Sequence, residues 1–112
     1  MHELSIASYI IESVESSIPP GTEVKTIRLQ IGKLSNVLPE ALTFSFDIIK
    51  EETLLKNAVM EIEVKDVIVK CNQCGNESIS DPPFIHCSLC GSFDVAVCSG
   101  EQLEITEIEI ES

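Results

Sequence analysis

This sequence has little positive charge and few aromatic side chains. Seven Lys and Arg residues stand against 19 Asp and Glu residues, which gives a formal net charge of −12, and there is no tryptophan. Binding of a nucleic-acid backbone depends on clustered Lys and Arg side chains. In the cysteine-rich stretch from Val67 to Gly100, Lys70 is the only such residue. The charge pattern therefore argues against a nucleic-acid partner.

Long apolar runs and histidine are also scarce. No apolar run approaches the roughly 20 residues that a membrane span requires, although the hydrophobic content of 44% is typical of a folded globular protein. The two histidines, His2 and His86, form no nucleophile and base constellation with a neighbouring residue. We see no signal peptide ahead of the domain. We therefore expect a soluble, cytoplasmic protein that does not act on a membrane and is not an enzyme.

Cysteine occurs in an informative pattern. Four of the five cysteines form two Cys-x-x-Cys pairs, each closed by a glycine: Cys71-Asn-Gln-Cys74-Gly75 and Cys87-Ser-Leu-Cys90-Gly91. Two intervening residues let both thiolates of a pair reach one tetrahedral ion, and two pairs complete a four-sulfur shell. The glycine supplies a left-handed or closely approaching backbone position after the second ligand. The pattern predicts a structural Zn(II) site with no open position for catalysis.

Two disulfides or a redox-active dithiol are the competing interpretations of these cysteines. Neither fits a sequence without a signal peptide and without a thioredoxin-like βαβ context around either pair. We therefore favour zinc over both.

Two further residues lie near the cysteine pairs. His86 directly precedes Cys87 and could bond to a thiolate or replace a ligand, but we favour a polar neighbour with no metal role. Cys98 is the unpaired fifth cysteine. Free cysteine is commonly a small buried hydrophobe, so we favour that interpretation over a reactive thiol.

Hydrophobic periodicity predicts two helices and three strands outside the cysteine-rich stretch. Apolar residues recur every three to four positions in the helices and alternate in the strands. The predicted ranges are helices at 4–18 and 39–55 and strands at 24–31, 60–65 and 103–110. The fold class is α+β, with two helices packed on a small three-stranded sheet and an inserted zinc-ribbon module. We predict an α+β domain at 1–66 and 101–112 and a zinc-binding module at 67–100.

The second predicted helix carries a clear apolar stripe. Pro39 suits the first helical turn because its missing N–H would have no partner there. Leu42, Phe46 and Ile49 form the stripe that should pack on the sheet. We expect Phe44 and Ile48 to widen it.

The chain begins Met1-His2-Glu3, which can chelate a metal. The terminal amine, the amide nitrogen of His2 and its imidazole Nδ1 close fused five- and six-membered rings. Nitrogen donors in one plane suit Ni²⁺ or Cu²⁺. The alternative is a frayed helix start, with His2 solvated and Glu3 complementing the helix dipole.

Four landmarks in order resemble the HypA/HybF hydrogenase maturation family: Met1-His2-Glu3-Leu4-Ser5-Ile6, Pro39-Glu40-Ala41-Leu42, the two Cys-x-x-Cys-Gly motifs, and Gly100-Glu101-Gln102-Leu103. The resemblance covers essentially the whole chain. It implies a metallochaperone that carries Ni(II) and works with a GTPase of the HypB type. The client would be the large subunit of nickel–iron hydrogenase, and in some organisms urease.

The resemblance also implies residue roles. His2 matches the nickel ligand, Glu3 matches a position near nickel and in partner contact, and the structural zinc ligands match Cys71, Cys74, Cys87 and Cys90. Some relatives take a further nickel ligand from the loop before Pro39, where Leu38 offers no donor and Asn36 or Glu40 could substitute.

Two questions are left open by the sequence. The rival function is a zinc-ribbon protein-interaction adaptor that does not handle nickel, with His2 incidental. Insertion hinges near Asp66 and Gly100 would permit a domain-swapped homodimer.

Overall fold

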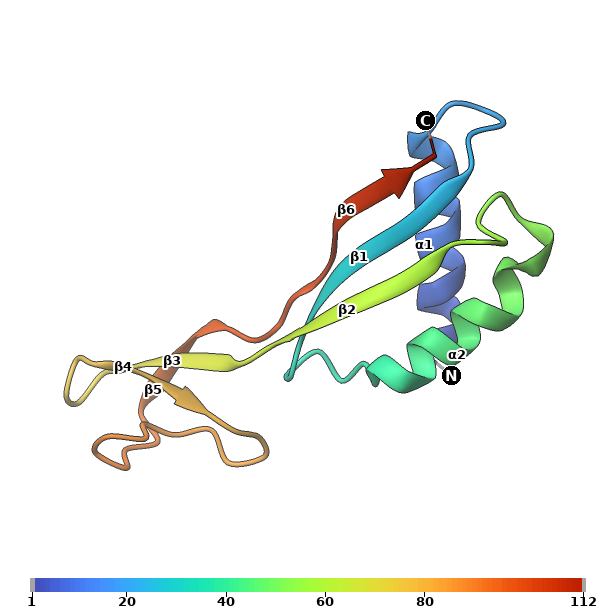
Figure 1. Ribbon diagram of the computed structural model, residues 1–112. Coiled ribbons are helices and arrows are strands. Elements are labelled where there is room, and N and C mark those ends of the chain that lie inside the picture. The colour runs from blue at the N-terminus through green and yellow to red at the C-terminus, as the bar shows by residue number, and fades with distance from the viewer. Residues whose placement is uncertain (1, 112) are drawn as a thin grey trace. The chain divides into compact units, whose positions relative to one another are not determined.

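The computed structural model describes residues 2–111, with the backbone alone for His2. The elements in chain order are α1 (His2–Ser17), β1 (Val24–Gly32), α2 (Pro39–Ile49), the 3₁₀ turn η1 (Lys50–Glu52), β2 (Val59–Lys65), β3 (Val67–Cys71), β4 (Glu77–Ser80), β5 (Val95–Ser99) and β6 (Leu103–Ile110) (Figure 1). The strands form two sheets, ordered β2-β1-β6 and β4-β3-β5. The predicted α+β class is confirmed, and the sequence analysis missed the second sheet.

The chain divides into two compact units, whose boundaries fall within β1, β2 and β6 and in the loop before α2. The helical unit comprises residues 1–29, 37–63 and 104–112, and the cysteine unit comprises residues 30–36 and 64–103. In the part of the chain that the structure describes, no helix is long and apolar enough to cross a membrane.

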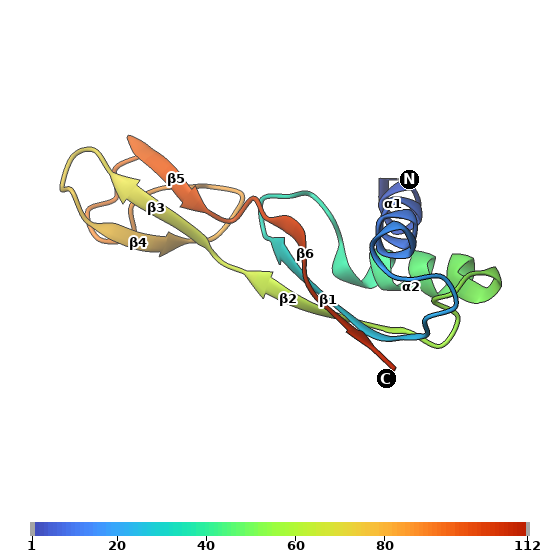
Figure 2. The same ribbon diagram turned by 90° about the horizontal axis from the view of Figure 1, so that it is seen from above.

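Both helices of the helical unit lie on the same side of the sheet β2-β1-β6 (Figure 2). The buried face of α1 consists of Ala7, Ile10, Ile11 and Val14, the three- and four-residue spacing of an amphipathic helix. Pro19-Pro20-Gly21 follows the helix, and Gly21 has a φ of 82°. Apolar side chains alternate on β1, where the buried ones are Val24, Ile27, Leu29 and Ile31.

The helix α2 is shorter than the sequence predicted, and fewer of its apolar residues are buried. Pro39 lies in its first turn as expected, but the α-helix ends at Ile49 and gives way to η1, not at residue 55. Leu42 and Phe46 are fully buried, while Phe44 and Ile48 are 68% and 57% exposed. The prediction that Phe44 and Ile48 widen the buried stripe is wrong, because α1 and the sheet cover only one side of this helix.

The cysteine unit is built on the central strand β3. Val67, Val69 and Cys71 are buried and alternate along it. β4 pairs antiparallel with one edge of β3 (Val67 opposite Ser80), and β5 pairs antiparallel with the other (Cys71 opposite Val95). The alternation places the sulfur of Cys71 on the buried face of this sheet.

A close backbone crossing and an ion-pair cluster join the ends of the cysteine unit. The N–H of Gly32 donates to the carbonyl of Gln102 at 2.7 Å, and the N–H of Leu34 donates to the carbonyl of Gly100 at 2.7 Å. Lys33 forms ion pairs with Asp66 at 2.8 Å and with Asp81 at 3.2 Å. A side chain at position 32 has no room, since a Cβ there would lie 2.0 Å from the Gly100 carbonyl oxygen.

Candidate metal centres

The sulfur atoms of the two cysteine pairs converge on one point. Those of Cys71, Cys74, Cys87 and Cys90 all lie within 4.8 Å of one another. The Cys71 and Cys90 sulfurs are 3.5 Å apart, and the Cys74 and Cys87 sulfurs are 3.7 Å apart. A zinc–sulfur bond of about 2.3 Å in a tetrahedron requires sulfur–sulfur distances of roughly 3.8 Å. The cluster therefore has the size and donor set of a closed four-thiolate zinc site.

The two pairs adopt the same backbone turn. The N–H of Gly75 donates to the carbonyl of Cys71 at 2.9 Å, and the N–H of Gly91 donates to the carbonyl of Cys87 at 2.9 Å. The φ angles of these glycines are 78° and 81°. This is the left-handed conformation that glycine adopts without a steric penalty from Cβ. The predicted role of the glycine after each pair is confirmed.

Backbone N–H groups inside each turn point at the first sulfur of the pair. Those of Gln73 and Cys74 donate to the Cys71 sulfur at 3.3 and 3.4 Å, and that of Cys90 donates to the Cys87 sulfur at 3.4 Å. The Cys74 N–H, followed by that of Gln73, lowers the pKa of Cys71. The Cys90 and Leu89 N–H groups lower the pKa of Cys87 to about 6. These bonds stabilise the thiolate form, which is the form that binds metal.

Four thiolates cannot coexist at these distances without a cation. The N–H of Ser92 favours the Cys90 thiolate, but the Cys71 sulfur, burial and the other sulfurs outweigh it and raise the pKa of Cys90 to about 12. A divalent cation removes this conflict because it attracts all four charges and displaces the remaining protons. The four cysteines thus suit Zn(II) as a structural ion, and the closed shell leaves no position for a substrate.

His86 and Cys98 do not join this cluster. Nδ1 of His86 lies 2.8 Å from the carbonyl oxygen of Phe84, and its ring packs against that of Phe93 with centroids 5.7 Å apart. These contacts agree with the interpretation of His86 as a polar neighbour. Cys98 is exposed, so its predicted burial is wrong. Cys98 belongs to β5, an edge strand of the three-stranded sheet β4-β3-β5.

The first turn of α1 holds the carboxylate of Glu3 beside the start of α2. Glu3 Oε2 accepts a hydrogen bond from the backbone N–H of Leu38 at 3.3 Å, and Leu38 is the N-cap residue of α2. The N–H groups of Glu3 itself and of Leu38 lower the pKa of this carboxyl group. These hydrogen bonds favour the ionised form of Glu3.

The structure describes only some of the other residues that the sequence analysis named as candidate nickel ligands. The chelating atoms of Met1 and the imidazole of His2 lie outside the described residues. Glu40 is exposed in the first turn of α2. The contribution of the Leu38 N–H was missed by the sequence analysis, because every residue except proline carries such a donor and no side-chain pattern marks it.

The chain is similar over nearly its whole length to one protein family. Residues 1–110 match the family model described as "Hydrogenase/urease nickel incorporation, metallochaperone, hypA". The Nostoc sp. protein named hydrogenase maturation factor HypA is 44% identical over 111 residues, covering 99% of this chain and 96% of that protein. A protein of the same name from Desulfosudis oleivorans is 39% identical over 113 residues, covering 98% of both chains.

The fold is similar to solved structures. The solution structure of the Ni metallochaperone HypA from Helicobacter pylori matches with a TM-score of 0.64 at 21% identity, covering 96% of each chain. A second solution structure, of HypA protein, matches with a TM-score of 0.64 at 23% identity, covering 99% of this chain and 97% of that one. At these identities the structural matches bear on the fold alone, and they agree with the predicted fold class.

Proposed function

Because this chain belongs to the HypA family of hydrogenase and urease nickel-incorporation metallochaperones, we propose that it binds Ni(II) at its N-terminus and delivers it during maturation of nickel–iron hydrogenase. The observation that carries this proposal is the family match from residue 1 to residue 110, which includes the N-terminal donors and both cysteine pairs. Urease is a second client in some organisms, by the same family resemblance.

The nickel donors in this proposal are the Met1 amine, the His2 amide nitrogen and the His2 imidazole. Planar nitrogen donors favour Ni²⁺ over hard cations, which prefer oxygen. The carboxylate of Glu3 follows directly in the chain, and the backbone N–H groups of Glu3 itself and of Leu38 lower its pKa. A negative charge at this position favours a cation nearby and disfavours its loss.

Zinc has a separate, structural role in this proposal. Cys71, Cys74, Cys87 and Cys90 would hold it, and the bound ion supplies folding free energy to a segment with few buried apolar residues. We assign residues 67–100 to this zinc-binding module and residues 1–66 and 101–112 to the nickel-binding domain. The protein has no catalytic role of its own, because its zinc shell is closed and nickel is its cargo.

The proposed partners act in the cytoplasm. A GTPase of the HypB type would exchange nickel with this protein, and the hydrogenase large subunit would receive it. The excess of acidic residues suits docking to basic protein surfaces and disfavours anionic polymers.

Nickel titration of zinc-loaded protein with its native N-terminus tests the proposal. The two histidines of the chain provide the variant and its matched control. We expect His2→Ala to abolish nickel binding, His86→Ala to retain it, and both to keep one zinc per chain. Equal nickel binding by wild type and His2→Ala would instead favour the zinc-ribbon adaptor that handles no nickel.

A further inference from the structure

The sheet of the helical unit has two edge strands, β2 and β6, and β2 is the one that borders the groove beside α2. β2 lies at the end of the sheet ordered β2-β1-β6, so within residues 2–111 no strand pairs with its outer side (Figure 1). An open edge presents backbone N–H and C=O groups that can pair with an extended segment of another chain. Neither the proposed nickel site nor the cysteine cluster uses this edge.

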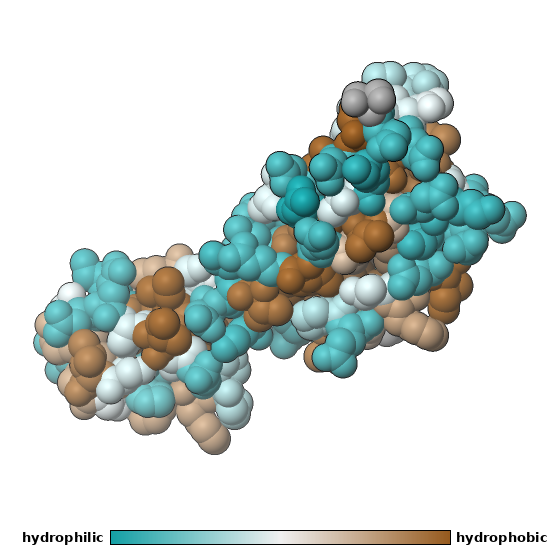
Figure 3. Space-filling view, in the orientation of Figure 1, coloured by the Kyte–Doolittle hydropathy of each residue, from teal (hydrophilic) through white to brown (hydrophobic). Residues whose placement is uncertain are grey.

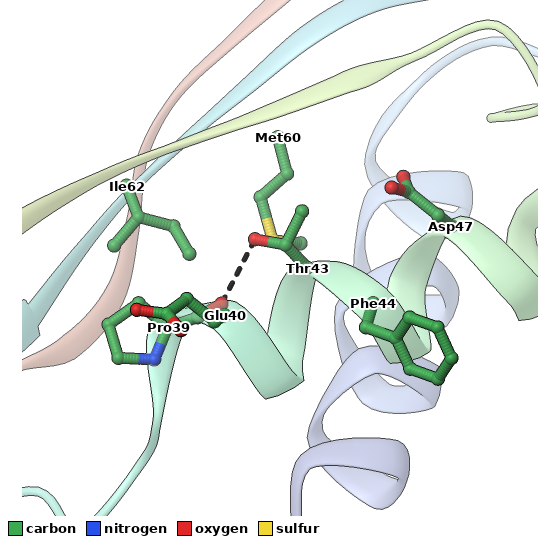
Figure 4. A pocket seen from close by; sticks show the side chains of 7 residues that line it. All are labelled: Pro39, Glu40, Thr43, Phe44, Asp47, Met60 and Ile62. Atoms are coloured by element: carbon green, nitrogen blue, oxygen red, sulfur yellow. Dashed lines mark hydrogen bonds between the residues drawn. The ribbon is translucent and has the colours of Figure 1, made fainter.

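A groove lies between β2 and α2, on the face of the sheet that the helices cover. Met60 and Ile62 point from β2 toward α2, where Pro39, Thr43 and Phe44 complete most of the lining (Figure 4). The groove has a volume of about 440 Å³. Its wall is mainly apolar, and Phe44 is 68% exposed. Apolar residues of this unit reach the surface among hydrophilic neighbours (Figure 3), so the groove could receive apolar side chains of an added strand.

Two of the polar side chains that line this groove are carboxylates. Glu40 and Asp47 line it from α2. Lys50 beside Asp47 is already engaged, since its Nζ donates to the carbonyl of Ala58 at 2.8 Å and lies 3.2 Å from an Asp47 oxygen. Its side chain is only 15% exposed. A partner that enters the groove therefore meets carboxylates.

The opposite face of the sheet is acidic as well. Arg28 of β1 forms ion pairs with Glu61 of β2 and with Glu107 and Glu109 of β6. One guanidinium shared by three carboxylates leaves this face with an excess of negative charge. Side chains of a strand alternate between faces, so Glu61 lies on the face away from Met60 and Ile62.

We propose that the β2 edge binds an extended, basic segment of another protein as a fourth strand of the sheet. Alternate apolar side chains of that segment occupy the groove beside Phe44, and its Lys or Arg side chains face Glu61 across the strand pair. Opposite charges and apolar side chains on facing strand positions both stabilise such pairing. A second copy of this chain is a poor occupant because two copies at −12 repel each other.

A pair of synthetic peptides tests this proposal on the zinc-loaded full chain without nickel. The probe is acetyl-Lys-Val-Lys-Val-Lys-Val-Lys-amide, and the control is the same composition in the order Lys-Lys-Lys-Lys-Val-Val-Val. We follow backbone amide signals by NMR at about 0.15 M salt, where long-range attraction is screened. We expect the alternating peptide to bind about tenfold more tightly, with shifts concentrated at residues 59–63 and 39–49.

Matched variants separate the groove from general acidity. We expect Phe44→Ala to weaken binding of the alternating peptide about fivefold, while Phe84→Ala, an equally exposed phenylalanine of the cysteine unit, leaves it unchanged. Asp47→Asn should weaken binding and Glu12→Gln should not.

Equal affinity for both peptides, or shifts spread over the whole acidic surface, would overturn the proposal. Concentration-dependent β2 signals without peptide would overturn it in favour of a second copy. None of these readouts involves nickel, so the result is independent of the proposed nickel function.

Discussion

The carboxylate of Glu3 accepts a hydrogen bond from the backbone N–H of Leu38, and so ties the first turn of α1 to the residue that precedes α2. Residues 35 positions apart in the sequence are thereby brought into contact. The bond is made to the ionised carboxylate, which makes its contribution dependent on pH.

The first prediction concerns the titration of Glu3. The backbone N–H groups of Glu3 and of Leu38 lower the pKa of Glu3 from its ordinary value of 4.5. These hydrogen bonds therefore contribute to stability above pH 4.5, and the contribution is lost as the pH falls through the lowered pKa. We expect ¹³C NMR of the side-chain carboxyl to show a midpoint below 4.5. Leu38→Pro removes the donor and should shift that midpoint upward, and an identical midpoint in both proteins would contradict the role of this bond.

The second prediction concerns the order in which the two metals leave. The proposed nickel donors at the N-terminus include an imidazole and an amine, and both groups must lose their protons before they bind a metal. We expect nickel affinity to fall at least tenfold between about pH 7.5 and 6, while zinc stays bound. Calorimetric titration with zinc analysis at each pH measures both. A flat nickel affinity over this range would exclude the amine and imidazole as donors.

The third prediction distinguishes the clustered cysteines from Cys98. Cys87 is buried in the four-sulfur cluster, whereas Cys98 is exposed outside it. We expect Cys87→Ser to lose zinc and the dispersed NMR signals of β3, β4 and β5, because metal binding and folding of such a module are coupled. Cys98→Ser should keep both. Full zinc content in Cys87→Ser would show that three sulfurs suffice.

The fourth prediction concerns the backbone crossing at Gly32. A Cβ at this position would lie 2.0 Å from the Gly100 carbonyl oxygen, which is too close for any real contact. We expect Gly32→Ala to lower the free energy of unfolding by at least about 2 kcal/mol. Gly21→Ala is the control, since Gly21 has a φ of 82° but open space around it. We expect Gly21→Ala to lower the free energy of unfolding by only roughly 1–2 kcal/mol, the cost of a left-handed backbone conformation. Denaturant unfolding of both variants measures the difference.

The fifth prediction compares two phenylalanines of α2. Phe46 is fully buried and Phe44 is 68% exposed. We expect Phe46→Ala to cost about 3–5 kcal/mol of unfolding free energy through lost burial and a cavity. Phe44→Ala should cost less than about 0.5 kcal/mol. Similar losses in the two variants would mean that Phe44 is buried in solution.

Local patterns predicted much of this molecule. The stripe of Ala7, Ile10 and Val14 and the alternation of Ile27, Leu29 and Ile31 correctly identified buried faces, because helical and strand periods are properties of the backbone. The same reasoning failed for Phe44 and Ile48. Periodicity says which residues share a face, but how wide a face is covered depends on the neighbouring elements.

The cysteine pairs show a similar division. Their spacing and the glycines that follow predicted the convergence of four sulfurs, since a Cys-x-x-Cys turn is a local structure with its own hydrogen bonds. The exposure of Cys98 was not predictable from its apolar neighbours, because the covering of a strand's face depends on which remote elements pack against it.

By itself, the sequence determined the class of this protein: an acidic, cysteine-paired α+β chain of the HypA family, with its metal donors carried at short spacings along the chain. Tertiary structure alone decided which distant groups meet. It placed the Leu38 N–H at the Glu3 carboxylate, brought Gly32 against Gly100, and left the β2 edge open beside Phe44. The physical reason is that spacing governs contacts within a turn, whereas contacts between remote segments depend on how whole helices and strands pack.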